Sequence, residues 1–399
     1  MRCAQAVGMQ DIVVVLEPEA ASLCVQNQQG AQVKPGDVVL VLDCGGGTVD
    51  LVTHDVQADG TVKELAAGSG DCCGGSYVDA AFLQLMERKY RAVYTDWATS
   101  KPKDVLKLHK CWLTAKITFG SGGKTNRALI ALPTSLHAAL EEAGELDGDD
   151  EDLELSEAEM KSIFDPIVDR ILQLTEEQYQ ASARRPTKLL LVGGFAGSPY
   201  LQQRVKAAFG ERVEAVVVPP TPGAAVVKGA VIYGLNPKTI AVRVARRTYG
   251  AGVRSVFKEG IHNPKHKVKD GDLGNYDATN TFSVFVSKGM DVECDSVVKQ
   301  TFVPHKADQV SFFIPFFSCV HADPVHTDEP GVRKEGSVSV ACPGQGLDRK
   351  VFVEMKFGRT QIQASATNEE GVRVETQLQF AQPRAGSGLV PAIGSLVPA

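Results

Sequence analysis

The pattern of hydrophobic and polar positions divides the chain into two parts. Up to about residue 235, short apolar runs of the kind that form buried strands alternate with stretches in which apolar residues recur at helical spacing. From Thr239 onward, short runs of alternating apolar and polar residues follow one another, separated by Gly, Pro, Asp and Asn. The pattern therefore predicts an α/β part followed by an all-β part.

Strands and helices alternate in the predicted α/β part. Strands are expected at residues 11–16, 38–42, 49–53, 61–65, 189–192 and 216–218, and helices after Pro18 and at about 76–90, 104–118, 155–180, from 199 and 222–233. The longest helix contains Pro166, where we expect a kink or a break. The acidic stretch 141–154 is expected to be a solvated, mobile connection. The glycine-rich residues 120–125 imitate a Walker A loop, but Thr118 stands where that loop needs its first glycine, so we expect a hairpin loop.

The all-β part is expected to contain strands near residues 240–244, 281–286, 310–317, 337–341, 351–357, 361–366 and 372–380. The basic patch at residues 265–269 is most simply a solvated loop. Residues 383–399 are rich in Gly, Pro, Ala and Ser, which predicts a flexible tail.

The segment VVLVLDCGGGTVDLVT, residues 38–53, carries the main candidate chemistry. Two apolar runs flank a turn, which predicts a β-hairpin with a functional tip. Gly45, Gly46 and Gly47 allow positive φ and a close approach of backbone N–H groups to an anion, and Thr48 adds a hydroxyl donor. Asp43 and Asp50 would repel a bare phosphate, so the pattern suits a phosphate bridged by a divalent cation or an attacking water. A tight glycine turn with two solvated aspartates is the alternative.

Other candidate site residues stand at predicted strand-to-helix junctions. Glu17 follows the first predicted strand and is either a functional acid at the strand edge or a solvated helix-capping acid. A glycine-rich loop at residues 67–75 precedes a helix, which is a place that suits an anion. Gly193 and Gly194 follow a wholly apolar strand, where they would let a flat ring lie against the backbone or would simply make a tight turn.

Composition favours an ordinary globular protein in a reducing compartment. Hydrophobic residues make up 43% and charged residues 23%, and the formal charge of −6 argues against a general binder of nucleic acid or anionic membranes. The nine cysteines form no CxxC pair, which favours reduced thiols over a disulfide framework. The first apolar run is too short for a signal peptide, and no window approaches the roughly 20 apolar residues of a membrane span. A cytoplasmic location is therefore expected.

Four motifs in this order resemble the seventy-kilodalton heat-shock (DnaK-like) chaperone family, which shares the actin-like ATPase fold: LEPEAAS, DCGGGTVDL, LLLVGGFAGSPYLQ and PGAAVVKGAVIYGL. The details CGGGTVDL, VGGF and VVKGAVIYGLNP are most similar to its divergent "member twelve" branch. The resemblance runs from about residue 13 to 249. It continues more faintly where YGAGV and FGRTQIQASATNEEGVRVETQLQF resemble the family's peptide-binding β-sandwich.

The resemblance implies ATP and Mg²⁺ as ligands and assigns a role to each matching residue. Asp43, Glu17 and Asp50 match catalytic acids, of which Asp43 and, through water, Glu17 help to place the metal. The phosphate-binding tip is matched by Gly45, Gly46, Gly47 and Thr48, the ribose and phosphate loop by Gly74 and Gly75, the adenosine loop by Gly193 and Gly194, and the adenosine-contacting helix by Lys116.

The sequence also departs from the family pattern. The opening hairpin D-x-G-T-T/S and the catalytic lysine that follows it have no match, and neither has the α-helical lid, so we expect a chain truncated at its N-terminus. In the adenosine site, the family's polar residues are replaced by Leu113, Ile117, Phe195 and Gly197.

The resemblance implies a fold class and a division into domains. We expect mainly the second lobe of an actin-like ATPase fold, with the first lobe largely missing, followed by a sandwich-like all-β domain. The predicted parts are a first-lobe remnant at 1–25, the second lobe at 26–235 with an inserted subdomain at about 99–155, a β domain at 236–382 and the tail at 383–399.

Three functions are compatible with this pattern. The first is an ATP-binding, chaperone-like protein of the stress response that couples nucleotide state to its β domain, with at most weak ATPase activity in this chain. Its partners would be ATP or ADP, unfolded client proteins and co-chaperones. The alternative is a non-enzymatic scaffold that keeps the fold with little or no nucleotide binding. A sugar kinase of the same fold is disfavoured, because the chain continues into a β domain.

Overall fold

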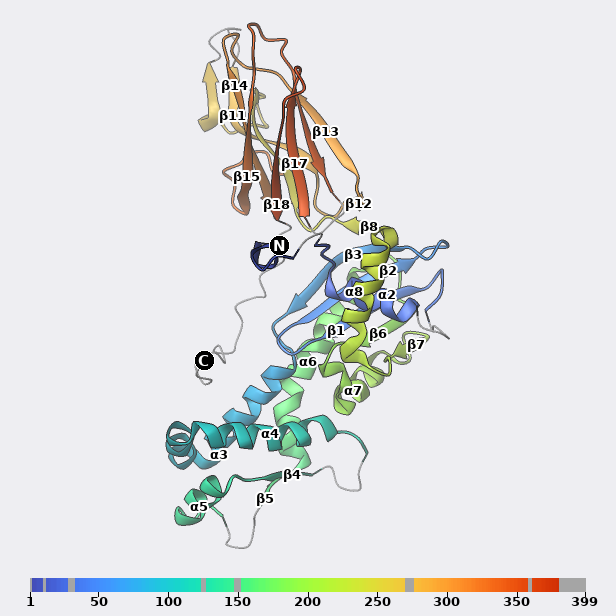
Figure 1. Cartoon of the computed structure of the whole chain (residues 1–399), viewed down its shortest axis with the longest axis vertical. Coiled ribbons are helices and arrows are strands. Elements are labelled where there is room, and N and C mark those ends of the chain that lie inside the picture. Colours follow the sequence, from blue (N-terminus) through green and yellow to red (C-terminus); the bar gives the residue numbers. More distant parts are fainter. Residues whose placement is uncertain are drawn as a thin grey trace. The chain divides into compact units, whose positions relative to one another are not determined.

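A computed structural model of the chain describes residues 2–9, 12–27, 33–122, 127–146, 152–269, 276–357 and 361–379 (Figure 1). Contacts divide it into two compact units. The α/β unit comprises Glu17–Val56 and Gly68–Leu235, and the β unit comprises Met1–Leu16, Gln57–Ala67 and Asn236–Gln382.

The α/β unit is built on a central mixed sheet. The strands β1 and β2 form an antiparallel hairpin, whereas β6 runs parallel to β1 and β7 parallel to β6. Every residue of β1 and β6 is buried, so this part of the sheet is covered on both faces, as their apolar runs predict. The end of β3 lies beside β2. The bounds are β1 (Val38–Cys44), β2 (Val49–Val56), β3 (Val62–Asp71), β6 (Lys188–Val192) and β7 (Ala215–Val217).

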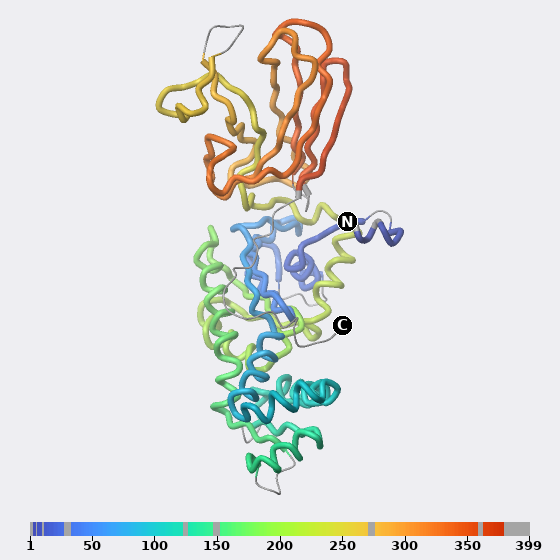
Figure 2. Tube along the Cα trace, turned by 90° about the vertical axis from the view of Figure 1, so that its left-hand side faces the viewer, coloured from blue at the N-terminus to red at the C-terminus, as the bar shows by residue number. Residues whose placement is uncertain are grey.

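Helices cover the sheet and form a separate layer beyond its end. The helices α2 and α6 both pack on β1 and β2, and α2 also packs along α8. Figures 1 and 2 show α4, α5 and the β4–β5 pair beyond the end of the central sheet. The bounds are α2 (Glu17–Gln26), α3 (Gly75–Ser100), α4 (Pro102–Thr118), α5 (Thr134–Glu142), α6 (Glu157–Ala181), α7 (Pro199–Phe209), α8 (Ala225–Leu235), β4 (Ala128–Ala131) and β5 (Asp152–Leu155).

One hydrophobic core joins the sheet to these helices. Apolar side chains at helical spacing on α6, among them Ile163, Phe164 and Ile171, meet the buried residues of β1 and β6. In the same core, Phe82 on α3 stacks on Trp112 on α4, with ring centroids 4.3 Å apart. Among the described residues, no helix is both long enough and apolar enough to cross a membrane.

Several local predictions for the α/β part are wrong. Residues 12–16 form no strand, although the helix predicted after them begins at Glu17. Residues 67–71 belong to β3, so the second glycine loop starts only at Cys72. The helix α6 continues through Pro166, which is exposed, so the break expected there does not occur.

The connections within the predicted inserted segment also differ from expectation. The loop after α4 leads into β4, which pairs with β5 far along the chain, so it is not a hairpin loop; residues 123–126 lie outside the described residues. The acidic stretch 141–154 includes the end of α5 and most of β5, and its residues 147–151 lie outside the described residues. The tail at 383–399 also lies outside them.

The β unit contains two antiparallel sheets that share one core. The strand order is β10-β11-β9-β14-β15 in one sheet and β13-β16-β17-β18 in the other. Inward-facing side chains from both sheets, among them Phe316, Val353 and Leu378, form one cluster. The bounds are β9 (Thr248–Val256), β10 (Lys267–Lys269), β11 (Tyr276–Val286), β13 (Val297–Phe302), β14 (Ser311–Cys319), β15 (Val332–Ala341), β16 (Val351–Lys356), β17 (Gln361–Asn368) and β18 (Arg373–Gln379).

Shorter elements complete the β unit. The short helix α1 (Arg2–Ala6) lies near its start, and β8 (Ile240–Val244) pairs in parallel with the beginning of β3 and antiparallel with β12 (Asp291–Glu293). The seven predicted β runs are confirmed, but β9, β10, β12 and β13 were not predicted. In β9, Gly250 and Gly252 interrupt the alternating pattern because a Cβ at either position would collide with the ring of Phe282 or Phe317.

Candidate functional site

The β1–β2 hairpin forms the centre of the candidate site. Asp43 faces Asp50 across the ladder, Cys44 faces Val49, and the Gly45 N–H donates to the Thr48 carbonyl at 2.9 Å. This register confirms the hairpin that the sequence predicts and places the glycines at its tip. The tip is exposed, whereas β1 behind it is buried, so the protein offers this backbone to solvent on a rigid support.

The tip keeps three neighbouring backbone donors open. Within the described part of the chain, the N–H groups of Gly46, Gly47 and Thr48 have no hydrogen-bond acceptor. The expectation that these glycines use positive φ is wrong, because none of the three does. The lack of a side chain at these positions leaves space for a ligand beside the N–H groups. A Cβ at Gly46 or Gly47 would point into open space, with no protein atom within 4 Å. The Thr48 hydroxyl donates to Asp50 Oδ2 at 2.9 Å.

The second glycine loop is docked onto this tip. The N–H groups of Gly74, Gly75 and Ser76 donate to the carbonyls of Gly47, Gly45 and Gly46 at 3.3, 3.0 and 2.8 Å. A Cβ at Gly74 would lie 2.5 Å from the Gly46 carbonyl oxygen, so only glycine permits this approach. These donors are therefore used within the protein. The loop supports the tip at the start of α3 and does not itself offer those N–H groups to a ligand.

Gly193 brings the end of β6 against Asp43. Its φ of +91° is in the left-handed region, and a Cβ there would lie 2.3 Å from the Cys44 carbonyl oxygen and 2.5 Å from Asp43 Oδ1. The next residue, Gly194, is exposed, and a Cβ there would meet nothing within 4 Å. The two glycines therefore have different roles, one in close packing and one at an open surface.

Three carboxyl groups act on one another beside the tip. Asp43 is only 4% exposed, and its Oδ2 has no hydrogen-bond partner among the described residues. Burial and, to a lesser extent, the charges of Glu17 and Asp50 together raise the pKa of Asp43 from 3.8 to about 7. The site therefore holds an unpartnered buried carboxyl whose ionised form lacks a cation.

The residues present fit a hydrated magnesium ion better than a fully protein-bound metal. Oxygen donors such as the orphaned Asp43 Oδ2 are the ligands that Mg²⁺ prefers, and this ion usually keeps several waters and takes one or two carboxylates plus phosphate oxygens. No group of three His, Cys, Asp or Glu side chains among the described residues is placed to hold a metal directly. Glu17, at the first position of α2, fits a water-mediated role.

Lys116 is held beside the second glycine loop. Its Nζ donates to the Gly75 carbonyl at 2.6 Å and to Asp79 Oδ1 at 2.8 Å, and it lies 5.8 Å from the centre of the Phe195 ring. Asp79 also accepts from Trp112 Nε1 at 2.8 Å. Asp79 therefore joins α3 to α4. Its spacing from Lys116 along the chain gives no signal of this pairing.

Replacing Lys116 with methionine is expected to lower the free energy of unfolding by about 1–3 kcal/mol, because it leaves a half-buried carboxylate and a carbonyl without their shared donor. Urea unfolding at pH 7.5 measures the change. The matched control is Lys107→Met, whose ion pair with Asp104 is largely exposed on the lysine side and is expected to contribute little to stability. Equal effects of the two substitutions would contradict a structural role for Lys116.

The region expected to hold adenosine is largely apolar. Phe195 is buried, and its side chain would lie 3.3 Å from a Cβ at Gly75, so the ring closes against the second glycine loop. Leu113 and Ile117 on α4 are 37% and 63% exposed. The structure therefore places Gly75, Lys116 and Phe195 together, while Leu113 and Ile117 present aliphatic surface to solvent.

Comparison with known proteins identifies the class to which this fold and site belong. The family model described as "Hsp70 protein" matches residues 1–240. The chain therefore belongs to the Hsp70 family.

Within the family, the chain is similar to its divergent twelfth members. It is 31% identical to heat shock 70 kDa protein 12A of Mus musculus over 376 residues, which cover 86% of this chain and 54% of that protein. It is 33% identical to heat shock 70 kDa protein 12B of Homo sapiens over 375 residues, covering 85% and 53%. The chaperone protein DnaK of Elusimicrobium minutum is 26% identical over 216 residues, covering 53% and 33%. The chain thus spans about half the length of the twelfth members that it matches.

Proposed function

We propose that this chain binds Mg²⁺-ATP or Mg²⁺-ADP at the tip of the β1–β2 hairpin. The observation that carries the proposal is the row of open N–H groups at Gly46, Gly47 and Thr48 beside the buried carboxyl of Asp43. Backbone donors suit phosphate oxygens, and a carboxylate beside them suits the cation that phosphate brings. Membership of the Hsp70 family supports nucleotide as the source of that phosphate.

Each residue of the site has a proposed role. The Asp43 carboxylate would orient the metal through its water shell, with Glu17 and Asp50 as further acids near the metal and the attacking water. Gly194 would face the adenosine, Gly193 would hold the end of β6 against Asp43, and Gly75 and Lys116 would border the ribose side. When bound, Mg²⁺ neutralises phosphate charge. The protein itself contributes the donors at the tip and the acids that hold water.

We further propose that these 399 residues hydrolyse ATP slowly at most. The residues present supply one phosphate-binding hairpin, and efficient phosphoryl transfer needs donors on both sides of the phosphate, placed to within about an ångström. In the Hsp70 manner, the state of the nucleotide would influence a chaperone-like β unit that binds unfolded client proteins. ATP and ADP, clients and co-chaperones are the proposed partners, and the cytoplasm is the proposed location.

A second candidate function is a scaffold that keeps the fold with little nucleotide binding. The packing around Gly75 favours it, because Phe195 fills space against this glycine and the Lys116 ammonium already has two protein acceptors. A nucleoside would have to bind beside aliphatic Leu113 and Ile117, which offer no hydrogen bonds. This candidate predicts a folded chain that gives no heat with Mg²⁺-ATP.

The substitution Gly46→Val separates the two candidates. A Cβ at Gly46 meets nothing within 4 Å, so the variant is expected to fold normally while its side chain crowds the open N–H groups. Losing one or two charge-assisted hydrogen bonds should weaken Mg²⁺-ATP binding about tenfold or more. Calorimetry measures the affinity. The control is Gly234→Val, at an equally open glycine on α8, and equal affinities for the two variants would refute binding at the tip.

A further inference from the structure

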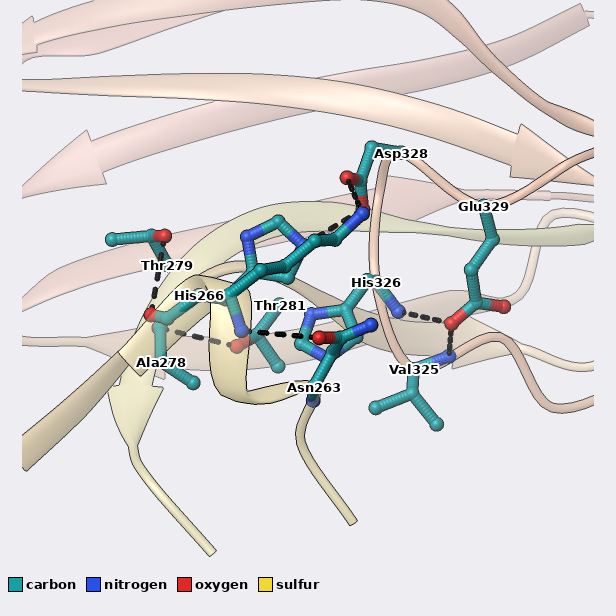
Figure 3. Close-up of polar contacts among 10 residues, drawn as sticks. Asn263, His266, Ala278, Thr279, Thr281, Val325, His326, Asp328 and Glu329 are labelled. Atoms are coloured by element: carbon teal, nitrogen blue, oxygen red, sulfur yellow. Dashed lines mark hydrogen bonds and ion pairs between the residues drawn. The ribbon is translucent and has the colours of Figure 1, made fainter. Parts of the chain in front are cut away.

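Three histidines of the β unit lie close to one another. His262, His266 and His326 are 9%, 6% and 4% exposed. The ring of His326 lies 5.6 Å from that of His262 and 4.5 Å from that of His266. The expectation that residues 265–269 form a solvated loop is therefore wrong: His266 is buried at the end of a short 3-10 helix (Pro264–His266), and Lys267–Lys269 form β10 (Figure 3).

His326 fastens the segment after β9 by accepting a backbone hydrogen bond. Its Nε2 accepts from the Asn263 N–H at 3.0 Å, so the neutral ring carries its proton on Nδ1. This Nδ1 is buried and has no partner among the described residues. Protonation of the ring would put a second proton on Nε2, where it would face the Asn263 N–H. The charged ring and this hydrogen bond therefore exclude each other.

The neutral ring of His262 also accepts a backbone hydrogen bond that protonation would break, but here the accepting nitrogen is Nδ1. Its Nδ1 accepts from the Lys258 N–H at 3.0 Å, so a proton added to Nδ1 would break that bond. Burial lowers the pKa of His262, and the nearby His326 and Lys258 lower it further. The bonds to Lys258 and Asn263 close the turn that leads from β9 to the short 3-10 helix. Protonation at both rings would remove both bonds.

The carboxylates around the cluster pair with other groups and do not stabilise the protonated rings of His262 and His326. Asp328 is 3.1 Å from His266 Nε2 and 2.7 Å from Lys265 Nζ, and these partners lower its pKa. Glu259 pairs with Lys267 at 3.0 Å. Glu329 Oε1 accepts from the N–H groups of Val325 and His326 at 3.0 and 2.7 Å (Figure 3). Among the described residues, none of these carboxylates pairs with the ring of His262 or His326.

We propose that His262 and His326 form an acid-sensitive latch in which His326 holds residues 258–263 against the loop at 325–329 and His262 closes the turn within that segment. With both rings neutral, each accepts one backbone N–H and the latch is closed. As the pH falls below about 6.5, the ordinary pKa of histidine, the opened segment binds protons more readily than the closed one. The closed state is therefore favoured above this pH and progressively lost below it.

Opening the latch changes a pocket of the β unit. The pocket has a volume of about 730 Å³ and is walled by the latch segment on one side and by Val325, His326 and residues 328–330 on the other. Release of residues 258–263 would open this wall and expose its lining, while Lys265 and His266 stay paired with Asp328. The latch thus makes access to this pocket depend on pH, independently of any nucleotide at the hairpin tip.

Hydrogen exchange of the whole chain, read by mass spectrometry, tests the latch. The peptide covering 258–266 contains both amides whose hydrogen bonds the histidines accept. After correction for the intrinsic effect of pH, its protection is expected to fall at least about tenfold between pH 7.5 and pH 5.5. A peptide from β14 is expected to keep its protection. Unchanged protection of 258–266 at pH 5.5 would overturn the proposal.

A double variant separates the latch from general acid unfolding. His262→Asn and His326→Gln keep an oxygen acceptor near the position of the accepting nitrogen but cannot be protonated in this range. The double variant is expected to show the same protection of 258–266 at both pH values. The control His305→Gln changes an exposed histidine of the same unit and should retain the wild-type loss. An equal loss in the double variant and the control would also overturn the proposal.

Discussion

Replacing Asp43 with asparagine is expected to stabilise the protein at pH 8 and to abolish its binding of Mg²⁺-nucleotide. Asp43 is buried with one oxygen unpartnered, and its pKa is raised from 3.8 to about 7. Such a shift corresponds to about 4 kcal/mol between the two protonation states, an upper bound on what ionisation costs the folded protein. Asparagine removes that charge, so we expect a gain of about 1–3 kcal/mol without ligand, together with loss of the group that orients the metal.

The dependence on pH makes the Asp43→Asn prediction specific. Between pH 3.8 and about 7 the folded state holds a proton on Asp43 that the unfolded state has released, so stability falls as the pH rises through this window. The variant should therefore melt several degrees above the wild type at pH 8 and by clearly less at pH 5, because only part of this window has been passed at pH 5. Thermal unfolding at both pH values, with and without Mg²⁺-ATP, measures this. A wild type more stable than the variant at pH 8 without ligand would contradict the raised pKa.

Replacing Gly229 with alanine is expected to lower the free energy of unfolding by about 3 kcal/mol or more. Gly229 lies in the middle of α8, where this helix packs along α2. A Cβ there would lie 1.6 Å from the carbonyl oxygen of Ala20 and 2.3 Å from its carbonyl carbon. Both neighbours are backbone atoms, so no side chain can move aside, and the two helices would have to separate.

The same helix offers the control for Gly229→Ala. A Cβ at Gly234 meets nothing within 4 Å, so Gly234→Ala is expected to be neutral or to stabilise by about 0.5–1 kcal/mol through helix propensity. Chemical denaturation of both variants measures the difference. If Gly229→Ala were as stable as Gly234→Ala, the close packing of α2 on α8 would be wrong.

The parts of the fold that local pattern determines were predicted from the sequence. The β1–β2 hairpin, the buried strand β6 and the helices α4 and α7 follow from apolar runs, helical spacing and the positions of glycine and proline. The placement of Asp43 beside the glycine tip follows from the same hairpin, because the ladder fixes its register. The domain boundaries and the roles of the site residues stay predictions.

Features that depend on contacts between segments far apart in the sequence could not be predicted from the sequence pattern. Gly74 looked like a phosphate donor, but its N–H bonds to a carbonyl of the neighbouring loop, a contact between segments far apart in sequence. Positive φ was expected at the tip and occurs instead at Gly193, where β6 must pass close to Asp43. His266 has lysines on both sides in the sequence, yet it is buried because His326 and Asp328 approach it from another loop.

Calorimetric titration of the folded chain with Mg²⁺-ATP at pH 7 tests whether nucleotide binds at the hairpin tip. We expect heat from the wild type that is lost in Asp43→Asn, and an affinity weakened about tenfold or more in Gly46→Val. We also expect release of a fraction of a proton on binding, because Asp43 is about half protonated near this pH in the free protein and ionises beside the metal. No heat from the folded wild type, or equal heat from all three proteins, would contradict nucleotide binding at the hairpin tip.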